Sequence, residues 1–529
     1  MKAFPYKIAI VGLGPKGMYA LERILAQLKA SPVQQIVEIH LFNKTTFMGS
    51  GDVYRSDQPD YLQMNFSNKH INMWPAELPP PVVEHPLSLS EYLKKQNSID
   101  EIDPLFSSRA MVGAYLENGY AQLCANLPEN VIIHQHISKV GSIVKVGTHY
   151  SIEFEEQGET PSLSDFQNIL ISTGHQQHKT PDDASENEIS FIYPVEDKLK
   201  NIREGQIVAI KGMGLTFIDA ALALTEGRGG AFTDSDDGKL IYKATGKEPR
   251  CIFPFSKSGW PMLPKHNFNE YPRELYVSKL SRLKPKKLSF QNDILPLITQ
   301  DMEFAYYRTL FAEQKELLAY HPNYDEVKNQ INDFHEKHPQ YKLFSMRNLL
   351  EPAFDSYKRT DQNILEYLKI YSHEKIENIE HKAQLRAAAV WQRFSPLFNE
   401  LYSFSGLDAK SHQEFDQYYF GKFNRIAYGP PPQNLKKILA LAEAGIINFQ
   451  FARSPEIRIY KSGFVLSNDE SEMYCDVLID ARIPKNAMEK EASGLFSNLC
   501  KNGLARPYVN RDENAHYAPG AVEINRYGK

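Results

Sequence analysis

The sequence contains one pattern twice: a short apolar segment, closely spaced glycines and an apolar helix. The two copies are Ile8–Ala20 and Val208–Ala220. In both, the apolar segment is typical of a buried strand, and the spacing after it is typical of a helix. The glycines that correspond in the two copies are Gly12 with Gly212 and Gly14 with Gly214. The repetition predicts an α/β fold with two Rossmann-like dinucleotide-binding domains.

The length of 529 residues leaves room for more than these two domains, since one domain usually takes about 100–200 residues. Long charged and aromatic segments with helical spacing fill much of the remainder. We predict a first dinucleotide-binding domain over residues 1–195, a second over 196–284, a mainly helical insertion over 285–425, and a return to the first domain over 426–529. The first domain would therefore be split in sequence.

Composition excludes several classes of function. The formal charge of −5 provides no basic field for nucleic acid. The four cysteines are scattered, without CxxC pairs or metal-like spacing to histidine, so we expect a reducing compartment and no metal. The sequence shows no secretory apolar segment and no run of about 18 apolar residues. We therefore expect a cytoplasmic protein without a membrane partner, and we make no prediction of its oligomeric state.

The first glycine motif, GLGPKG, has the spacing that binds a diphosphate. Gly12 permits a tight turn, Gly14 permits close approach of a diphosphate, and Gly17 permits the helix to pack on the strand. Pro15 and Lys16 complete the turn at the helix N-terminus, where free N–H groups and the helix dipole favour an anion.

The second strand of this unit ends at Asn43 and Lys44, where a ribose-binding carboxylate would be usual. The amide of Asn43 could still bond to ribose hydroxyls, without contributing charge.

The second motif keeps Gly212 and Gly214, followed by Thr216, but Phe217 replaces the third glycine. This pattern predicts either a nicotinamide dinucleotide site or a repeat whose pocket has been altered or emptied. Lys257, in the loop after a later strand, could meet a 2′-phosphate and so favour NADPH over NADH. It could equally be a solvated surface charge.

These motifs, together with YRSDQPDYLQMN, ILISTGH and TGKEPR, resemble the FAD/NAD(P)-binding protein family of flavoprotein monooxygenase type. Nearly the whole chain is similar to that family, which includes a group of nitrosuccinate-forming aspartate N-monooxygenases. The resemblance implies FAD at the first motif, NADPH or NADH as reductant at the second, and O2 as oxidant acting on a small-molecule substrate.

The resemblance also assigns residues to these cofactors. Thr173 and Gly174 match an element that closes on FAD, and Gly12, Gly14 and Gly17 match the turn around its diphosphate. The segment from Arg55 to Asn65 matches one expected beside the isoalloxazine ring, with the candidate residues Arg55, Asp57, Gln58, Met64 and Asn65. Asp480 and Gly520 match a C-terminal strand and turn that usually reach the flavin, although Asp480-Ala481-Arg482 departs from the usual glycine-containing element.

Three side chains are candidates for a catalytic role. Gln58 and Asn65 could position the ring and bond to the reacting oxygen, or they could be loop amides that cap their own backbone. His175 could donate or accept a proton near the flavin, or it could be an ordinary loop histidine. Arg393 and Arg425 would suit an amino-acid carboxylate, or they could be surface charges.

The leading hypothesis is an FAD-dependent, NAD(P)H-reduced monooxygenase, with N-hydroxylation of a small amine or amino acid as its favoured chemistry. A flavin reductase or dehydrogenase that does not oxygenate is one alternative. A nucleotide-binding regulatory protein is another, in which Asn43 and Phe217 would mark altered sites.

Overall fold

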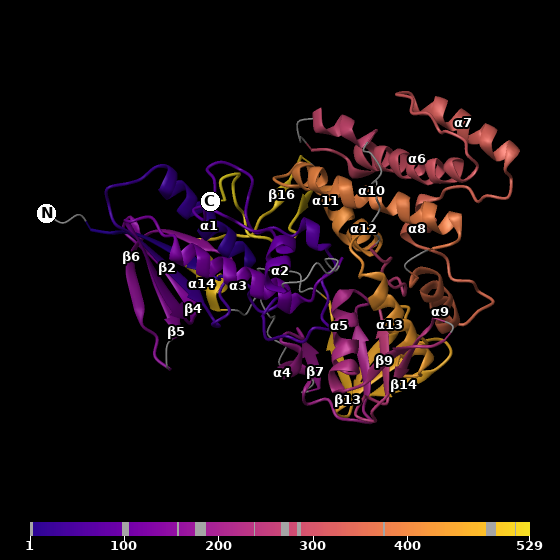
Figure 1. Ribbon diagram of the computed structural model, residues 1–529, viewed down its shortest axis with the longest axis horizontal. Coiled ribbons are helices and arrows are strands. Elements are labelled where there is room, and N and C mark those ends of the chain that lie inside the picture. The colour runs from indigo at the N-terminus through magenta and orange to yellow at the C-terminus, as the bar shows by residue number, and fades with distance from the viewer. Residues whose placement is uncertain are drawn as a thin grey trace.

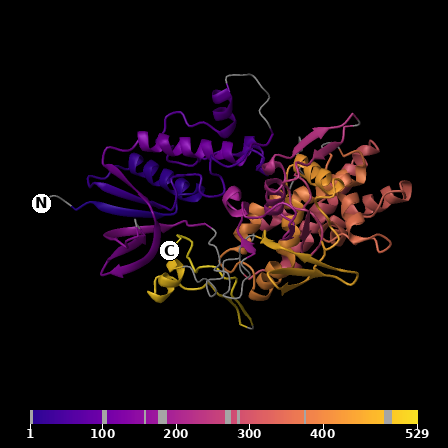
Figure 2. The same cartoon turned by 90° about the horizontal axis from the view of Figure 1, so that it is seen from below.

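The structure is a computed structural model that describes residues 4–97, 105–155, 158–174, 187–236, 238–265, 275–282, 287–373, 376–482, 494–513 and 515–528. Figure 1 shows three regions: a lobe built on one sheet, a second lobe built on another, and a helical region above the second lobe. Figure 2 shows the same separation of the two lobes from below. The predicted α/β architecture with two dinucleotide-binding folds and a helical insertion is confirmed.

The first lobe contains a six-stranded sheet in the order β3-β2-β1-β6-β5-β4. The strands β1, β2, β3 and β6 run parallel, whereas β5 pairs antiparallel with both β4 and β6. The parallel pairing places the carboxyl ends of β1, β2 and β6 at one edge, where such folds bind ligands. The strand bounds are β1 (Tyr6–Val11), β2 (Val37–Asn43), β3 (Val131–Ile137), β4 (Lys139–Val146), β5 (His149–Glu155) and β6 (Ser162–Ile171).

Helices α1 (Pro15–Ala30) and α3 (Arg109–Ala125) pack in one hydrophobic core with strands β1, β2 and β3. Helix α3 begins after Ser108, whose side chain accepts a hydrogen bond from the Met111 N–H and so satisfies one free donor of the first turn. The other elements of this lobe are η1 (Asn68–His70), α2 (Leu89–Asn97) and α14 (Gly494–Lys501).

The second lobe contains a four-stranded parallel sheet in the order β11-β8-β15-β7. Its strands are β7 (Glu188–Ser190), β8 (Ile207–Lys211), β11 (Cys251–Phe255) and β15 (Val477–Asp480). Around it lie the helical elements α4 (Val195–Leu199), α5 (Leu215–Ala223), η2 (Glu226–Arg228) and α13 (Pro432–Glu443). Two antiparallel ribbons complete this lobe: β9 (Ala231–Asp234) with β10 (Leu240–Lys243), and β12 (Glu456–Tyr460) with β13 (Gly463–Ser467) and β14 (Glu472–Cys475). A further ribbon, β16 (Asn510–Arg511) with β17 (His516–Tyr517), packs against the helical region instead.

The prediction that residues 426–529 return to the first domain is wrong for their strand β15. Val477 pairs with Val208 of β8, so β15 lies in the second sheet, and β7 lies beside it although it falls within 1–195. Of the C-terminal helices, α14 does pack against β4 of the first sheet, where the Asn498 amide donates to the Gly141 carbonyl at 2.8 Å. An apolar strand suits either parallel sheet, so its sequence does not specify its partner.

The helical region shares one continuous hydrophobic core with the second sheet. Its longest helices, α6 and α10, pack along each other, and the ring of Trp391 stacks on Phe423 with centroids 3.9 Å apart. The helical elements are η3 (Val277–Arg282), η4 (Phe290–Ile294), α6 (Leu295–Glu313), α7 (Tyr324–Lys337), α8 (Met346–Leu350), α9 (Thr360–Tyr371), α10 (Ile379–Tyr402), α11 (Ala409–Glu414), η5 (Phe415–Tyr419) and α12 (Phe420–Ala427). Among the described residues, no helix combines the length and apolar character needed to cross a membrane.

Candidate dinucleotide sites

The first glycine turn, residues 12–17, connects β1 to α1, and the fold itself requires two of its glycines. Gly12 has φ +93°, and a Cβ built on it would lie 2.6 Å from the Ser172 carbonyl oxygen. A Cβ on Gly17 would lie 2.1 Å from the Gly12 carbonyl oxygen. Both positions therefore exclude any side chain, because the backbone could not move away without opening the strand–helix junction.

Gly14 of the same turn is different, because the fold would accept a side chain there. Its φ of −78° is open to any residue, and the nearest atom to a built Cβ is the Gly51 Cα at 3.8 Å. Gly14 is the N-cap of α1, beside N–H groups of the first turn that have no acceptor within the helix. A glycine that packing does not require leaves the backbone open to close approach by a ligand.

Asn43 supports the first glycine turn from the end of β2. Its side chain is buried, its Oδ1 accepts the Leu13 N–H at 3.1 Å, and its Nδ2 donates to the Thr45 carbonyl at 2.8 Å. The amide would have to exchange these partners to bind a ribose as predicted. Lys44 extends away and pairs with Asp52 at 2.6 Å.

The Ser172-Thr173-Gly174 segment after β6 is held against the same turn. The Ser172 N–H donates to the Val11 carbonyl at 2.8 Å, and its hydroxyl donates to the Gly12 carbonyl at 2.6 Å. The structure thus places Thr173 beside Gly12, with its Cα 2.9 Å from a Cβ built on that glycine, and Gly174 follows it in the chain. His175 falls outside the described residues.

The segment from Arg55 to Asn65 is held in place largely by its own side chains. Arg55 forms a two-point ion pair with Asp57, and its guanidinium lies 4.4 Å from the centroid of the Phe47 ring. Gln58 is buried and donates to the Val53 carbonyl at 2.7 Å, whereas its Oε1 is buried without a hydrogen-bond partner.

The end of this segment reaches the second lobe. Asn65 donates to the Tyr428 carbonyl at 3.1 Å, and the neighbouring Met64 is buried, with its N–H on the Ser107 carbonyl at 2.9 Å. Gln58 therefore caps the backbone of its own loop, as the structural alternative for it states, whereas Asn65 donates to a carbonyl of a distant segment. The free Oε1 of Gln58 leaves one buried acceptor for a ligand.

The second glycine turn, residues 212–217, repeats this geometry at the junction of β8 and α5. Gly212 has φ +114°, whereas Gly214 is the helix N-cap with φ −93° and would meet only the Met262 Sδ, 3.8 Å from a built Cβ. Thr216 follows in the first turn of α5. Phe217, at the position of the third glycine, is buried in the core that joins this lobe to the helical region.

Two further candidates lie at the edge that carries this second turn. Asp480 ends β15, pairs in register with Lys211 and binds Arg482 at 2.6 Å. Asp480 therefore lies in the second sheet and not in a return to the first domain, and its contact with the flavin stays a prediction. Lys257 is exposed and follows β11, the other neighbour of β8. Gly520, with φ +86°, lies beyond β17.

A buried charged group joins the two lobes, and the sequence did not indicate it. Arg109 of α3 pairs with Asp219 of α5 at 2.6 Å, and both side chains are buried. Tyr193 donates to Asp219 and accepts from Arg109 at 2.8 Å. Burial raises the pKa of the Asp219 carboxyl, and the neighbouring guanidinium opposes that rise. The residues are too far apart in sequence for any local pattern to relate them.

Lys265 is a second group that sequence reasoning missed. It is 7% exposed, and its Nζ has no hydrogen-bond partner; it lies 4.2 Å from the centroid of the Phe66 ring. Its N–H donates to the Pro430 carbonyl at 2.8 Å, which places it between the Asn65 segment and the loop before α13. Burial lowers the pKa of this lysine to about 8. A lysine at the end of the apolar run WPMLPK was the available signal.

Arg425, a candidate for carboxylate binding, has a structural role instead. Its guanidinium is buried and donates to the Leu349 carbonyl at 2.5 Å and to the Tyr367 hydroxyl at 3.2 Å. Arg393 lies in α10 and also has an interaction partner. Unlike Arg425 and Arg393, Lys265 is therefore a buried cation whose charged group has no hydrogen-bond partner.

Comparison with known proteins gives a family for the first lobe. A family described as FAD-NAD(P)-binding matches residues 9–176. Nitrosuccinic acid synthase of Aspergillus oryzae is 27% identical, over 95% of this chain and 82% of that protein. The nitrosuccinate-forming L-aspartate N-monooxygenase of Streptomyces davaonensis is 25% identical, over 94% of this chain and 85% of that protein.

Among solved structures, the reduced form of the ornithine hydroxylase PvdA of Pseudomonas aeruginosa is 10% identical, with a TM-score of 0.42 and coverage of 94% of this chain and 86% of that chain. The first lobe is therefore similar to an FAD-NAD(P)-binding family over residues 9–176, and the chain is similar along nearly its whole length to nitrosuccinate-forming enzymes.

Proposed function

We propose that the protein is an FAD-dependent, NAD(P)H-reduced monooxygenase that oxidises the amino nitrogen of a small, carboxylate-bearing amine. The observation that carries the proposal is the pair of N-cap glycines, Gly14 and Gly214, in turns where the fold would accept a side chain. Two sites open to a dinucleotide suit an enzyme that passes electrons from a nicotinamide to a flavin.

The first turn fits FAD. Gly12 and Gly17 shape the backbone, Gly14 leaves room for the diphosphate, and the Thr173-Gly174 segment borders the same edge. When bound, FAD would supply the activation of O2 and the transfer of one oxygen atom to a nucleophilic nitrogen. Gln58 would contribute its buried, unused Oε1 as an acceptor for an N–H of the flavin or of the substrate.

The second turn fits the nicotinamide dinucleotide, with Gly214 and Thr216 at the start of α5. Lys257 lies past the carboxyl end of the neighbouring strand, where an exposed ammonium would favour the additional phosphate of NADPH. Phe217 stands at the position of the third glycine, and its side chain is buried in the core. The altered motif is therefore compatible with an intact turn.

The environment of Lys265 favours a substrate that carries a carboxylate. An ammonium that is buried without a polar partner is destabilised, and an anion placed against it recovers that cost. Lys265 lies beside Phe66, directly after the Asn65 segment that we assign to the flavin ring. The relatives of this chain named for L-aspartate act on an amine that carries carboxylates.

The proposal is tested with purified protein and a panel of small amines. We expect bound FAD, and NADPH oxidation that L-aspartate or another amino acid accelerates, with formation of an N-oxygenated product. A flavin-containing protein whose NADPH oxidation yields only hydrogen peroxide with every amine would favour the reductase alternative. A protein that neither contains nor binds FAD would favour the regulatory alternative.

A further inference from the structure

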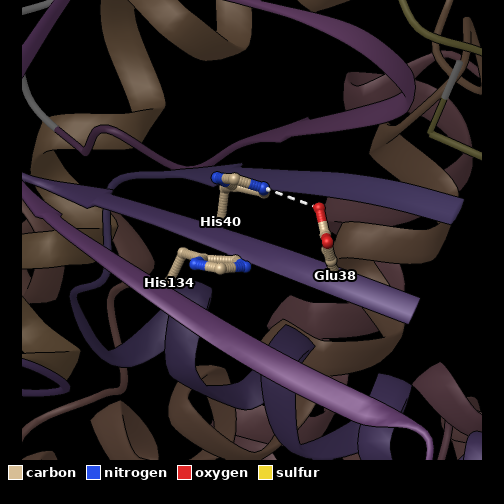
Figure 3. Close-up of side chains that lie close together, drawn as sticks. All are labelled: Glu38, His40 and His134. Atoms are coloured by element: carbon tan, nitrogen blue, oxygen red, sulfur yellow. Dashed lines mark ion pairs between the residues drawn. The ribbon is translucent and has the colours of Figure 1, made fainter. Parts of the chain in front are cut away.

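The first sheet carries a group of imidazoles that the proposed oxidation does not use. Glu38 and His40 alternate along β2, and His134 and His136 alternate along the neighbouring edge strand β3. The parallel register places His40 opposite His134, so all four side chains lie on one face of the sheet. We call Glu38, His40 and His134 the histidine cluster (Figure 3).

Two nitrogens of the histidine cluster are buried and unused. His40 is 6% exposed, and its Nε2 has no hydrogen-bond partner; the Nε2 of His134 is also buried without one. The two rings stack with centroids 4.5 Å apart, and Figure 3 shows Glu38 extending toward the His40 ring. Buried polar atoms almost always have a hydrogen-bond partner in native proteins, and a bound ion is one recognised reason for an exception.

The distances suit a divalent metal ion. One ligand atom from each of Glu38, His40 and His134 lies within 4.8 Å of the other two, and the Glu38 Oε2 lies 3.6 Å from the His40 Nε2. Tetrahedral zinc with bonds of about 2.0–2.1 Å separates its ligand atoms by roughly 3.4 Å. To reach that separation the Glu38 carboxylate would have to rotate, and the His134 ring would have to turn out of its stack on His40 so that its Nε2 lone pair points at the ion.

His136 provides the supporting contact that such a site needs. The His40 Nδ1 lies 3.0 Å from the His136 Nε2, so a proton on His40 Nδ1 can be donated to His136, which leaves the His40 Nε2 lone pair free. Metal-bound histidines usually donate their other N–H in this way.

We propose that Glu38, His40 and His134 bind one divalent transition-metal ion, with Zn²⁺ as the best match and water as a further ligand. The ion would connect the edge strand β3 to β2, and β2 ends at Asn43, which holds the first glycine turn. Its role would therefore be structural, and it is independent of the proposed oxidation. Lys7, which pairs in register with Glu38, is a positive charge that opposes the ion.

The test uses full-length protein without a polyhistidine tag, freed of metal with a chelator. We expect calorimetric titration with Zn²⁺ to give one equivalent bound, and Zn²⁺ to raise the thermal midpoint. Co²⁺ should give the intense visible bands of a tetrahedral site. His134→Gln and, separately, Glu38→Gln should each weaken Zn²⁺ binding at least tenfold, whereas His85→Gln, at an exposed histidine of another segment, should leave it unchanged.

Two results would overturn the site. One is wild-type protein that binds no stoichiometric Zn²⁺ or Co²⁺, and the other is binding that persists unchanged in both His134→Gln and Glu38→Gln. Because Glu38 is partly exposed at the surface of the sheet, its variant tests the site even where His134→Gln fails to fold.

Discussion

Lys265→Met removes the buried ammonium and keeps an unbranched apolar stem of similar length. Burial moves the pKa of this lysine from its ordinary value of 10.5 to about 8. That difference corresponds to about 3 kcal/mol of unfavourable burial of the charge, at about 1.4 kcal/mol per tenfold change in an equilibrium constant. The variant should therefore be at least as stable as the wild type at pH 7, by up to about 3 kcal/mol.

The same substitution should weaken substrate binding. A hydrogen bond to a charged group contributes about 1.5–3 kcal/mol, so its loss should raise the Kd of a carboxylate-bearing substrate about 10-fold to 100-fold. Calorimetric titration with L-aspartate measures this change, and Lys95→Met, at an exposed lysine of α2, is the matched control. The FAD content should stay at the wild-type level.

The pH dependence has a defined sign. In the folded protein Lys265 loses its proton near pH 8, whereas in the unfolded chain it keeps the proton until about pH 10.5. The stability difference between Lys265→Met and wild type should therefore be full below pH 8 and disappear above about pH 10.5. Wild-type affinity for the carboxylate should fall as the pH rises above about 8.

Three results would refute this reasoning. Unchanged substrate affinity in Lys265→Met would show that the ammonium does not bind the substrate. Loss of FAD from that variant would assign the charge to the flavin instead. A variant less stable than both wild type and Lys95→Met would show that the ammonium is stabilised within the folded protein.

Further substitutions test the glycine turns and the contact between the lobes. Gly14→Ala should fold, as measured by circular dichroism, but should lose bound FAD, as measured by visible absorbance. Gly12→Ala should fail to fold because of its φ of +93° and its contact with Ser172. FAD retained in Gly14→Ala would contradict the proposed FAD site. Gly214→Ala should keep its flavin and raise the KM for NADPH at least about tenfold, and an unchanged KM would argue against the second site. Asp219→Ala should reduce the free energy of unfolding by about 3–5 kcal/mol, measured by chemical denaturation, because it leaves Arg109 buried and unpaired. A reduction below about 1 kcal/mol would show that water reaches the Arg109–Asp219 pair.

The glycine turns were predictable because local backbone sterics determine them. Gly12 and Gly17 leave no room for a Cβ, and that requirement appears directly as a spacing in the sequence.

The misplaced and missed residues depend on contacts that are distant in sequence. Asp480 ends an apolar strand that would suit either sheet, and the pairing of that strand with β8 depends on tertiary contacts. Lys265 is buried by Phe66 and the Pro430 loop, and Asp219 is paired across the lobes with Arg109. No window of the sequence contains both members of these pairs, so pattern reasoning could not find them.

The central claim is that oxygen from O2 is transferred to the nitrogen of a carboxylate-bearing amine. The most direct measurement is mass spectrometry of the products formed from NADPH and L-aspartate, or another small amino acid, under ¹⁸O2. We predict a product that carries ¹⁸O on its nitrogen and whose formation requires both NADPH and bound FAD. Flavin-loaded protein that consumes NADPH and releases only labelled hydrogen peroxide, with every amino acid, would contradict the account.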